Sequence, residues 1–371
     1  MNKKELKIKK ILVGICGIGN GHINRQICVI KELLKNNYEV LVATESCKIQ
    51  TIKDTFKNVK VIELYIPWIV CNEKGFDFKE TLDKYNDIDL FRKFLEFGNK
   101  IEQELNGKPD LIISDYEPNV AQYAYATCTP LITMEQQSKF LYLDELKLKD
   151  YSIREEIYRI NYFFPKFDKK VVSSFFPINI NDNKIIQVPP IITKIKRKKI
   201  INDFIIVYLS PYSDSYIYDK LIDILSEIKN FNFKIYSKNY ETYIDKFNFD
   251  NVEFSKFNEQ FKKDISQCSA LITTGGHQLI SEAISIELPI YVMPLNTYEQ
   301  HYNAYMVNYY NLGSNNEVTK DNIIKFIENR ELYRNNIKKY KDKYYTEKWE
   351  NTFIDIVKEL LNDKWHERIY W

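Results

Sequence analysis

The sequence predicts two tandem, doubly wound (Rossmann-like) α/β domains, and three observations support this fold class. The chain has 371 residues, which is too long for one ordinary domain and enough for two. Short apolar segments alternate with segments whose apolar residues recur at helical spacing, as in βαβ units around a parallel sheet. The proline pair Pro189-Pro190 and a basic run interrupt this alternation near residues 187–203, which indicates a linker between two domains.

The alternating segments fall into two series. In the first series we expect strands at 11–16, 38–43, 59–66, 111–114 and 131–133, and helices at 23–34 and 118–127. In the second we expect strands at 204–209, 233–236, 252–254, 270–273 and 290–293, followed by helix from about residue 318 to the end. We therefore assign residues 1–190 to a first domain and 200–345 to a second. Residues 346–371 are expected to form a C-terminal helix that packs back on the first domain.

Charge and cysteine content restrict the class of protein. The chain has 53 Lys and Arg against 51 Asp and Glu, a net charge of +2. This balance lacks the excess of positive charge that is typical of nucleic-acid-binding proteins. The six cysteines form no CxxC pair and no zinc spacing, so we expect reduced thiols in the cytoplasm. The run 11–16 is too short for a signal peptide, and no run approaches the ~20 apolar residues of a membrane span. The basic run 194–199 is interpreted either as a solvated linker or as a contact with anionic lipid on the inner face of the membrane.

Glycine and histidine are scarce, with 10 and 4 residues in the whole chain, yet they gather at two places. Each place follows an expected strand and opens an expected helix. We infer that both backbone freedom and imidazole chemistry are needed there. The first place holds Gly14, Gly17, Gly19, Gly21 and His22, and the second holds Gly275, Gly276 and His277.

The first cluster lies at the edge where parallel sheets bind ligands, beyond the carboxyl end of a strand. The spacing Gly17-x-Gly19-x-Gly21 differs from the GxGxxG dinucleotide fingerprint, so a nicotinamide cofactor is not expected. His22 opens the following helix, and an imidazole is the natural general base at neutral pH. The alternative is a histidine that caps this helix or fills the wall of a pocket.

An acidic turn follows the strand expected at 111–114. The carboxyl end of that strand faces the same crevice as His22, so Asp115 is placed to accept a hydrogen bond from the imidazole and fix its tautomer. The alternative is that Asp115 caps the helix that begins near Pro118. Glu117 and Glu135 are further carboxylates that could reach this edge.

The second cluster again reads as strand, glycine turn and helix, over residues 270–283. Free N–H groups at such a helix start form an anion site that suits phosphate. Glu282 lies inside this helix and is either a ligand-binding carboxylate or a solvated surface residue. The next strand, 290–293, leads to the acid–amide pair Glu299-Gln300.

These motifs resemble the donor-binding signature of GT-B glycosyltransferases, in particular UDP-glycosyltransferases and the peptidoglycan N-acetylglucosaminyl and plastid galactolipid enzymes. The resemblance is specific across 268–313, moderate across 10–35 and 108–135, and architectural elsewhere. Two departures stand out: the turn Leu209-Ser210-Pro211-Tyr212 lacks the glycines often seen there, and Thr274 stands where plant-type members have histidine. The matching residues are Gly275-Gly276, Ser281-Glu282-Ala283, Pro294, Glu299-Gln300 and Asn303-Ala304, with Gly19-x-Gly21-His22 and Ser114-Asp115 in the first domain.

The resemblance implies a first domain that binds the acceptor, a second domain that binds the nucleotide-sugar donor, and a reaction in the cleft between them. It implies that His22 acts as the base and that Asp115 orients it. On the acceptor side it places Gly19, Asn20, Gly21 and Glu117. On the donor side it places Ser210, Thr274, Gly275, Gly276 and His277 at the phosphates, Phe257 with the adjoining backbone of Lys256 at the nucleobase, Glu282 at the ribose, and Glu299 and Gln300 at the sugar hydroxyls.

The predicted function is therefore inverting transfer of a hexose from a nucleotide sugar, expected to be a UDP-sugar, to an acceptor hydroxyl. No cofactor and no essential metal are expected, because a helix N-terminus can stabilise the departing diphosphate. A glycolipid or cell-envelope acceptor is expected, and nucleic acid is not. Two alternatives stay open: a UDP-sugar 2-epimerase or hydrolase, and a catalytically silent nucleotide-sugar-binding protein. The acceptor, the sugar, the nucleotide, the oligomeric state, and the choice between His22 and a nearby carboxylate as base also stay open.

Overall fold

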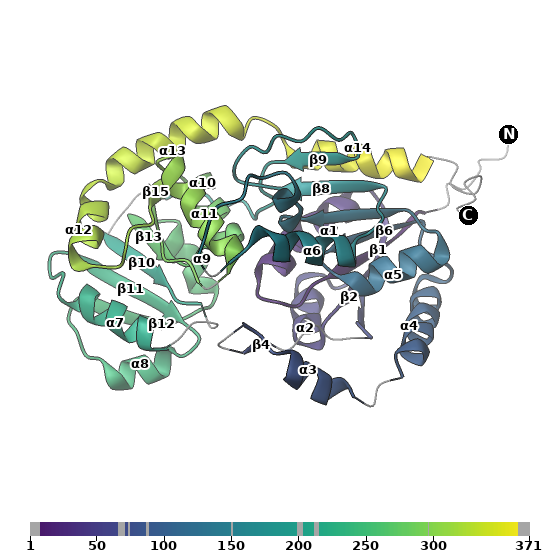
Figure 1. Ribbon diagram of the computed structural model, residues 1–371, viewed down its shortest axis with the longest axis horizontal. Coiled ribbons are helices and arrows are strands. Elements are labelled where there is room, and N and C mark those ends of the chain that lie inside the picture. Colours follow the sequence, from purple (N-terminus) through teal and green to yellow (C-terminus); the bar gives the residue numbers. More distant parts are fainter. Residues whose placement is uncertain are drawn as a thin grey trace.

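The protein is represented by a computed structural model that describes residues 8–65, 71–72, 75–86, 89–149, 151–198, 203–210, 215–295 and 297–362. Two parallel sheets stand side by side, each with helices on both faces (Figure 1). We refer to the layers around these sheets as the first and second domains.

The first sheet has seven described strands in the order β3-β2-β1-β6-β7-β8-β9, all parallel. The chain runs outward from β1 in one direction and then returns to place β6 on its other side. Such a reversal opens a crevice at the carboxyl ends of the two central strands. The strands are β1 Lys10–Ile15, β2 Glu39–Thr44, β3 Lys60–Glu63, β6 Leu111–Asp115, β7 Leu131–Glu135, β8 Lys169–Ser173 and β9 Ile185–Val188.

Helices cover both faces of the first sheet, and a small hairpin accompanies them. Residues of α1, α2 and the C-terminal helix α14 (Trp349–Asn362) pack on one face, and residues of α4, α5 and α6 on the other. The helices are α1 Gly21–Lys35, α2 Ser46–Thr55, α3 Phe78–Tyr85, α4 Leu90–Leu105, α5 Pro118–Thr127 and α6 Ile153–Phe163, with the 3₁₀ turn η1 Gln137–Leu141. The hairpin pairs β4 Cys71–Asn72 with β5 Gly75–Phe76.

The second sheet has six described strands in the order β12-β11-β10-β13-β14-β15. Its reversal lies between β10 and β13, so a second crevice is expected there. The strands are β10 Phe204–Tyr208, β11 Asn232–Ser237, β12 Val252–Lys256, β13 Ala270–Thr273, β14 Ile290–Val292 and β15 Gly313–Ser314. The helices of this domain are α7 Ser215–Ser226, α8 Tyr240–Lys246, α9 Glu259–Ile265, α10 His277–Ser285, α11 Tyr298–Tyr309, α12 Lys320–Glu328 and α13 Arg330–Tyr344.

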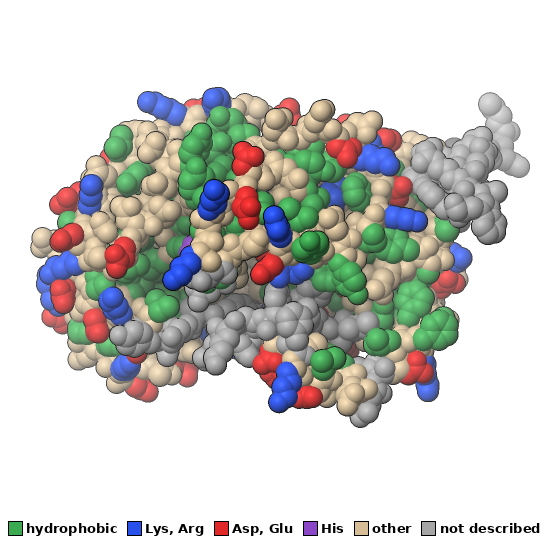
Figure 2. Space-filling view, viewed as in Figure 1, with side chains coloured by type: hydrophobic (Ala, Val, Ile, Leu, Met, Phe, Trp, Pro, Cys, Tyr) green, Lys and Arg blue, Asp and Glu red, His purple; other side chains and the backbone are tan. Residues whose placement is uncertain are grey.

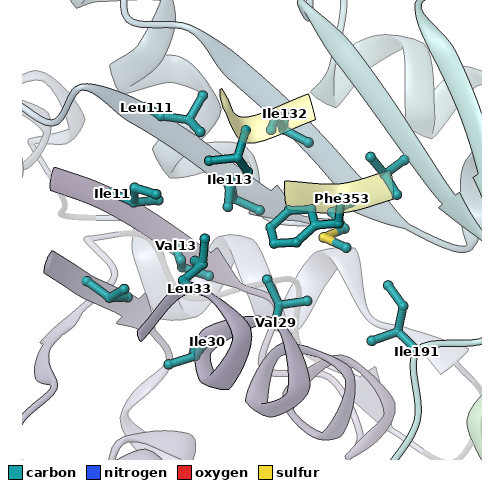
Figure 3. Packing of buried hydrophobic residues seen from close by; sticks show 14 of the residues in the cluster. Ile11, Val13, Val29, Ile30, Leu33, Leu111, Ile113, Ile132, Ile191 and Phe353 are labelled. Atoms are coloured by element: carbon teal, nitrogen blue, oxygen red, sulfur yellow. The ribbon is translucent and has the colours of Figure 1, made fainter. Parts of the chain in front are cut away.

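The last helix, α14, belongs to the core of the first domain. Alternate residues of β1 and β6 face α1, and Phe353 of α14 packs into the same apolar cluster (Figure 3). Burying Phe353 in this way is worth about 1.5–3 kcal/mol of hydrophobic free energy. Figure 1 shows α14 lying along β8 and β9 after the chain has crossed back from the second domain.

A continuous apolar cluster also joins the two domains. Phe140, Phe175 and Phe176 of the first domain pack with Tyr298 and Tyr302 of α11 in the second. The Phe140 ring meets both tyrosine rings edge-on, with centroids 5.6 and 5.8 Å apart. The domains therefore meet through a buried aromatic contact.

The expected strands and helices are present with shifted ends, but the sequence interpretation missed β8 and β9. Strand β8 begins with Lys169 and Lys170, which do not suggest a buried strand. Lys170 is nevertheless fully buried because its ammonium group lies 3.6 Å from the Glu135 carboxylate. The helical end from about residue 318 is divided into α12, α13 and α14. The expected strand 59–66 is shorter, since β3 ends at Glu63 and residue 66 lies outside the described part.

The segment between the domains is held to the second domain by its backbone and by Arg197. The Arg197 guanidinium donates to the carbonyl oxygens of Ile265 and Cys268, at 3.3 and 2.5 Å. Lys194 lies 3.6 Å from Glu350, and Lys199 lies outside the described residues. Figure 2 shows Lys and Arg interspersed with Asp and Glu over the coloured part of the face in view.

Candidate active site

The first half of the candidate site forms where β1 and β6 end. These two strands are paired so that Ile15 lies opposite Asp115. The glycine turn after β1 includes Gly19, whose φ of 65° is costly for residues with a side chain. Helix α1 then starts at Gly21 with no side-chain cap and no acidic residue in its first turn. The turn thus brings His22 directly opposite the end of β6.

His22 and Asp115 are in contact. The Nδ1 atom of His22 lies 2.7 Å from Oδ1 of Asp115. Burial by itself raises the pKa of the Asp115 carboxyl group, but the Arg25 guanidinium and the His22 ring outweigh it and hold that pKa at about 2. An ionised carboxylate can only accept hydrogen bonds, so His22 donates to it from Nδ1; Arg25 Nη2 lies 3.1 Å from the same nitrogen and donates to the same carboxylate. In a neutral ring with its proton on Nδ1, the lone pair is on Nε2.

Residues that the sequence analysis missed complete the surroundings of Asp115. Arg25 donates to the carboxylate from Nε at 2.8 Å and from Nη2 at 2.6 Å, and Gln26 donates from Nε2 at 2.7 Å. Both side chains are buried. Arg25 and Gln26 follow His22 by three and four residues, so helical spacing places all three on one face of α1. This spacing is the feature of the sequence from which Arg25 and Gln26 could have been predicted as neighbours of His22.

The helix cap at the end of β6 is Glu117, and the alternative interpretation of Asp115 as the cap is wrong. The Glu117 carboxylate accepts hydrogen bonds from the backbone N–H groups of Asn119 and Val120, both at 2.8 Å. Burial raises its pKa to about 7. The Glu117 carboxylate thus caps the start of α5. Its expected position on the acceptor side remains a prediction.

Two more features surround the imidazole. The Tyr116 ring stacks on the His22 ring, with centroids 6.0 Å apart and an interplanar angle of 16°. Glu135 ends the neighbouring strand β7, where Ser138 donates a hydrogen bond to it and Lys170 faces it. Glu135 is fully buried, whereas His22 keeps 12% of its side chain exposed. Of these two side chains, only that of His22 is partly exposed.

The second half of the candidate site is the glycine turn between β13 and α10. The backbone N–H of Gly275 donates to Oε1 of Gln300 at 2.9 Å, and Asn303 Nδ2 donates to the Gly275 carbonyl oxygen at 2.9 Å. A Cβ on Gly275 would lie 2.4 Å from the Gln300 carbonyl oxygen. Only glycine fits there, so the turn is fixed against the start of α11.

Helix α10 begins without a side-chain cap from the described residues. Its N-cap residue, Gly276, offers no side-chain cap, and a Cβ built there would meet nothing within 4 Å. No acidic residue occupies the first turn of α10. An uncapped helix start next to open space is suited to an anion such as a phosphate group. Thr274, just before the cap, is buried in the same turn.

The two glycine turns face each other. A Cβ on Gly21, at the start of α1, would lie 3.7 Å from the Cβ of Gln278 in α10. Gln278 also donates to the Ile191 carbonyl oxygen of the interdomain segment at 3.2 Å. The start of α1, which carries His22, and the start of α10 therefore lie next to each other.

The other predicted donor residues lie along the same edge of the second sheet. Glu282, one turn into α10, is partly buried, and burial raises its pKa to about 7. Phe257 follows β12, keeps 39% of its side chain exposed and packs against Tyr208 at the end of β10, with centroids 5.2 Å apart. Ser210 follows β10, and its carbonyl oxygen accepts a hydrogen bond from Tyr218. Pro211 and Tyr212 lie outside the described residues.

His277 and the pair Glu299-Gln300 have unexpected surroundings. The His277 ring is buried against Phe175, with centroids 5.4 Å apart, and neither ring nitrogen has a hydrogen-bond partner among the described residues. Gln300 uses its amide oxygen to bind the backbone N–H groups of Gly275 and Leu295. Glu299 contacts the first domain, where Gln136 Nε2 lies 2.5 Å from one of its oxygens.

The described residues lack two kinds of feature. No group of three or more His, Cys, Asp or Glu side chains there is placed to hold a metal ion. The helices within the same residues include none that is long and apolar enough to span a membrane.

Comparison with known proteins relates most of the chain to one family. A family model described as Glycosyl transferase family 1 matches residues 9–330, and no curated protein matches the sequence. The fold is similar to that of Phytolacca americana UGT2 complexed with UDP-2fluoro-glucose and pterostilbene, at a TM-score of 0.68 and 13% identity over 96% of this chain and 100% of that one. It is also similar to glycosyltransferase VinC in complex with dTDP, at a TM-score of 0.64 and 12% identity over 95% of this chain and 100% of that one. A third similar structure is Acinetobacter baumannii MurG, at a TM-score of 0.63 and 13% identity over 95% of this chain and 99% of that one.

Proposed function

This chain belongs to glycosyl transferase family 1 and has the GT-B fold, and on that premise we propose that it moves a hexose from a UDP-sugar to an acceptor hydroxyl with inversion. The observation that carries this proposal is the orientation of His22. Its Nδ1 is held by the buried Asp115 carboxylate, which leaves Nε2 as a base beside the anion site at the start of α10.

The donor is proposed to bind along the edge of the second sheet. The N–H groups at the start of α10, with Thr274, Gly275 and Gly276, would hold the diphosphate. Glu282 would accept hydrogen bonds from the ribose hydroxyls, and the exposed face of Phe257 would stack on the nucleobase. The complexes of two structural neighbours with UDP-2fluoro-glucose and dTDP support a nucleotide sugar as donor; the choice of uridine is ours.

In the proposed reaction, Nε2 of His22 takes the proton of the acceptor hydroxyl as its oxygen attacks the anomeric carbon. The bond from that carbon to the diphosphate oxygen breaks, and the electron pair leaves with the diphosphate. Attack opposite the leaving group inverts the anomeric centre. The ionised Asp115 stabilises the imidazolium that forms, as a buried carboxylate does in other base–carboxylate pairs.

Stabilisation of the leaving diphosphate is assigned to the protein backbone. The start of α10 has no side-chain cap, so its N–H groups would be available to the diphosphate as negative charge develops, and such preorganised donors commonly supply several kcal/mol of transition-state stabilisation. We therefore propose that the reaction needs no metal ion. The acceptor would approach from the first domain, where His22 and Tyr116 form the wall of the crevice.

Product analysis tests the proposed function. Incubation with α-linked UDP-sugars and a panel of lipid, sugar and phenolic acceptors should give a nucleoside diphosphate and a β-linked glycoside, identified by the anomeric coupling constant in proton NMR. A retained α-linkage would contradict inversion. An isomerised free sugar nucleotide, or free sugar alone with every acceptor, would support the epimerase or hydrolase alternative.

A further inference from the structure

Lys139 is a buried cation without an anionic partner in the contact between the two domains. It belongs to η1 of the first domain, and its side chain is 0% exposed. Among the described residues, no carboxylate lies within ion-pair distance of its ammonium group, which instead lies over the rings of Phe140 and Phe176, 5.2 and 5.3 Å from the centroids. A buried charge is costly unless its surroundings require it, so the position calls for an explanation.

The ammonium group has two hydrogen-bond acceptors, both amide oxygens. Lys139 Nζ donates to Gln136 Oε1 at 2.6 Å and to Asn303 Oδ1 at 3.0 Å. Gln136 belongs to the first domain, whereas Asn303 lies on α11 of the second domain. Because a cation can only donate, it fixes both amides with the oxygen inward and the NH₂ group outward.

Each outward NH₂ group reaches one part of the proposed donor site. Gln136 Nε2 lies 2.5 Å from Glu299 Oε1, on the carboxylate expected to hold the sugar. Asn303 Nδ2 donates to the carbonyl oxygen of Gly275, in the turn expected to hold the diphosphate, at 2.9 Å. One ammonium group thus sets the orientation of two amides, and these hold a carboxylate and a backbone turn.

We propose that Lys139 is a positioning residue of the donor site, acting from the opposite domain through Gln136 on Glu299 and through Asn303 on the Gly275 turn. Donor binding and contact between the domains are then coupled, since the Lys139–Asn303 and Gln136–Glu299 hydrogen bonds both cross the interface. This inference rests on the proposed function, because it assumes that Glu299 and the turn bind a nucleotide sugar.

The charge of Lys139 depends on several groups around it. Burial lowers its pKa to about 8, while Glu299 of α11 and Glu156 of α6 act to raise it and Arg25 of α1 acts to lower it. His277 of α10 also faces it, and burial together with the Lys139 charge lowers the pKa of this ring. As pH rises through about 8, Lys139 should lose its charge and hold the amide groups of Gln136 and Asn303 less firmly in these orientations.

The test compares binding of the free nucleoside diphosphate with binding of the intact nucleotide sugar by calorimetry. The probes are UDP and the UDP-sugar with the highest affinity for the wild type among UDP-glucose, UDP-galactose and UDP-N-acetylglucosamine. Lys139→Met should weaken binding of both probes, and binding of the UDP-sugar by about tenfold or more, the effect of losing a charge-assisted hydrogen bond. Gln136→Leu removes only the hydrogen bond to Glu299. This variant should weaken binding of the UDP-sugar to a similar extent and leave binding of UDP unchanged.

Lys170→Met is the matched control. Lys170 is equally buried but contacts Ser138 and Glu135 within the first domain, so this variant should lose thermal stability and keep the ratio of the two affinities. In the wild type, the ratio of the affinity for the UDP-sugar to the affinity for UDP should fall between pH 7 and 9, because this ratio cancels effects on the shared UDP part; in Gln136→Leu the ratio should change little over this range.

Three results would overturn the inference. The first is a Gln136→Leu variant that binds the UDP-sugar as tightly as the wild type. If Lys139→Met does not fold, the Gln136→Leu variant alone decides the test. The second is a folded Lys139→Met variant with unchanged affinities. The third is a wild type that binds UDP but no sugar nucleotide more tightly. A wild type that binds neither probe would instead contradict the proposed function itself.

Discussion

His22 and Asp115 lie 93 residues apart in the sequence, and their side chains meet at 2.7 Å. The contact exists because β1 and β6 are neighbours in the sheet, with Ile15 opposite Asp115. A glycine turn after β1 then brings the first residues of α1 back over the end of β6. The contact fixes the tautomer of His22, and the reactivity proposed for this protein depends on it.

Asp115→Asn should lower kcat strongly with little change in the KM for the donor. The amide cannot hold Nδ1–H and stabilise an imidazolium in the same way, and comparable substitutions in other base–carboxylate pairs cost up to about 10⁴-fold. Steady-state kinetics of donor turnover measure this effect. Asp110→Asn, at the opposite end of the same strand, is the matched control and should keep kcat. Equal losses in both variants would contradict the role of Asp115.

Asp115 should also contribute to stability in a pH-dependent way. Its folded pKa of about 2 lies below the usual value of 3.8, so the unfolded chain binds protons more readily than the folded protein. The stabilisation is therefore complete above about pH 4 and is lost as pH falls toward 2. The wild type should therefore have a higher Tm than Asp115→Asn at pH 5, and this advantage should shrink as pH falls toward 2. A difference that disappeared between pH 7 and 5 would contradict this assignment.

Glu282→Gln should weaken nucleotide binding and remove its pH dependence. Burial raises the pKa of Glu282 from 4.5 to about 7, and only the ionised form accepts hydrogen bonds from two ribose hydroxyls. Wild-type affinity for UDP should thus increase between pH 6 and 8, whereas the variant should bind about tenfold more weakly at pH 8 with a flat profile. Glu287→Gln, just beyond the other end of α10, is the control and should keep the wild-type profile.

The same raised pKa predicts the sign of a stability change. A carboxyl group whose folded pKa lies above its unfolded pKa destabilises the folded protein as pH rises from 4.5 to about 7. Glu282→Gln should therefore raise Tm by a few degrees at pH 8 and change it little at pH 4. Thermal melts at the two pH values check this, and a lower Tm at pH 8 would contradict it.

Gly275→Ala and Gly276→Ala should behave differently although the two residues are adjacent. A Cβ on Gly275 would collide with backbone atoms of Gln300, so this variant should lose about 1–3 kcal/mol of stability together with donor binding. A Cβ on Gly276 meets nothing in the protein but would project toward the proposed phosphate site. That variant should keep its Tm and lose donor affinity; unchanged affinity would contradict a phosphate site there.

Removal of divalent metal ions should leave the activity unchanged. The start of α10 is proposed to stabilise the diphosphate without a metal ion, so EDTA should not reduce donor turnover. The sequence contains one Asp-x-Asp spacing, at 87–89, and Asp89 caps α4 by accepting a hydrogen bond from the Arg92 backbone N–H. Loss of activity in EDTA that Mg²⁺ or Mn²⁺ restored would contradict the proposal.

Features of the site that depend on local sequence were predictable. Glycines at a strand-to-helix turn indicate a ligand edge because few other residues adopt a φ like that of Gly19, and α5 was placed within its observed limits of Pro118–Thr127. The contact between His22 and Asp115 could also be predicted, because the carboxyl ends of parallel strands lie at the same edge of a sheet.

Contacts across the fold were not predictable from one sequence. The three-residue spacing from His22 pointed to Arg25, but its burial depends on Asp115 beneath it. Strand β8 was missed because Lys170 is buried by a partner from another strand. The bond between Gln136 and Glu299 depends on how the two domains meet, and nothing in the spacing of these residues encodes that.

The most direct measurement is nucleoside diphosphate release from UDP-, dTDP- and GDP-sugars by the wild type and by His22→Ala. One UDP-sugar should be turned over, and His22→Ala should bind it with unchanged affinity while turnover falls by about 10²- to 10⁴-fold, the usual contribution of a general base. His301→Ala, whose ring packs on Tyr151, should retain turnover. A His22→Ala variant that transferred sugar at the wild-type rate would contradict the mechanism proposed for this protein.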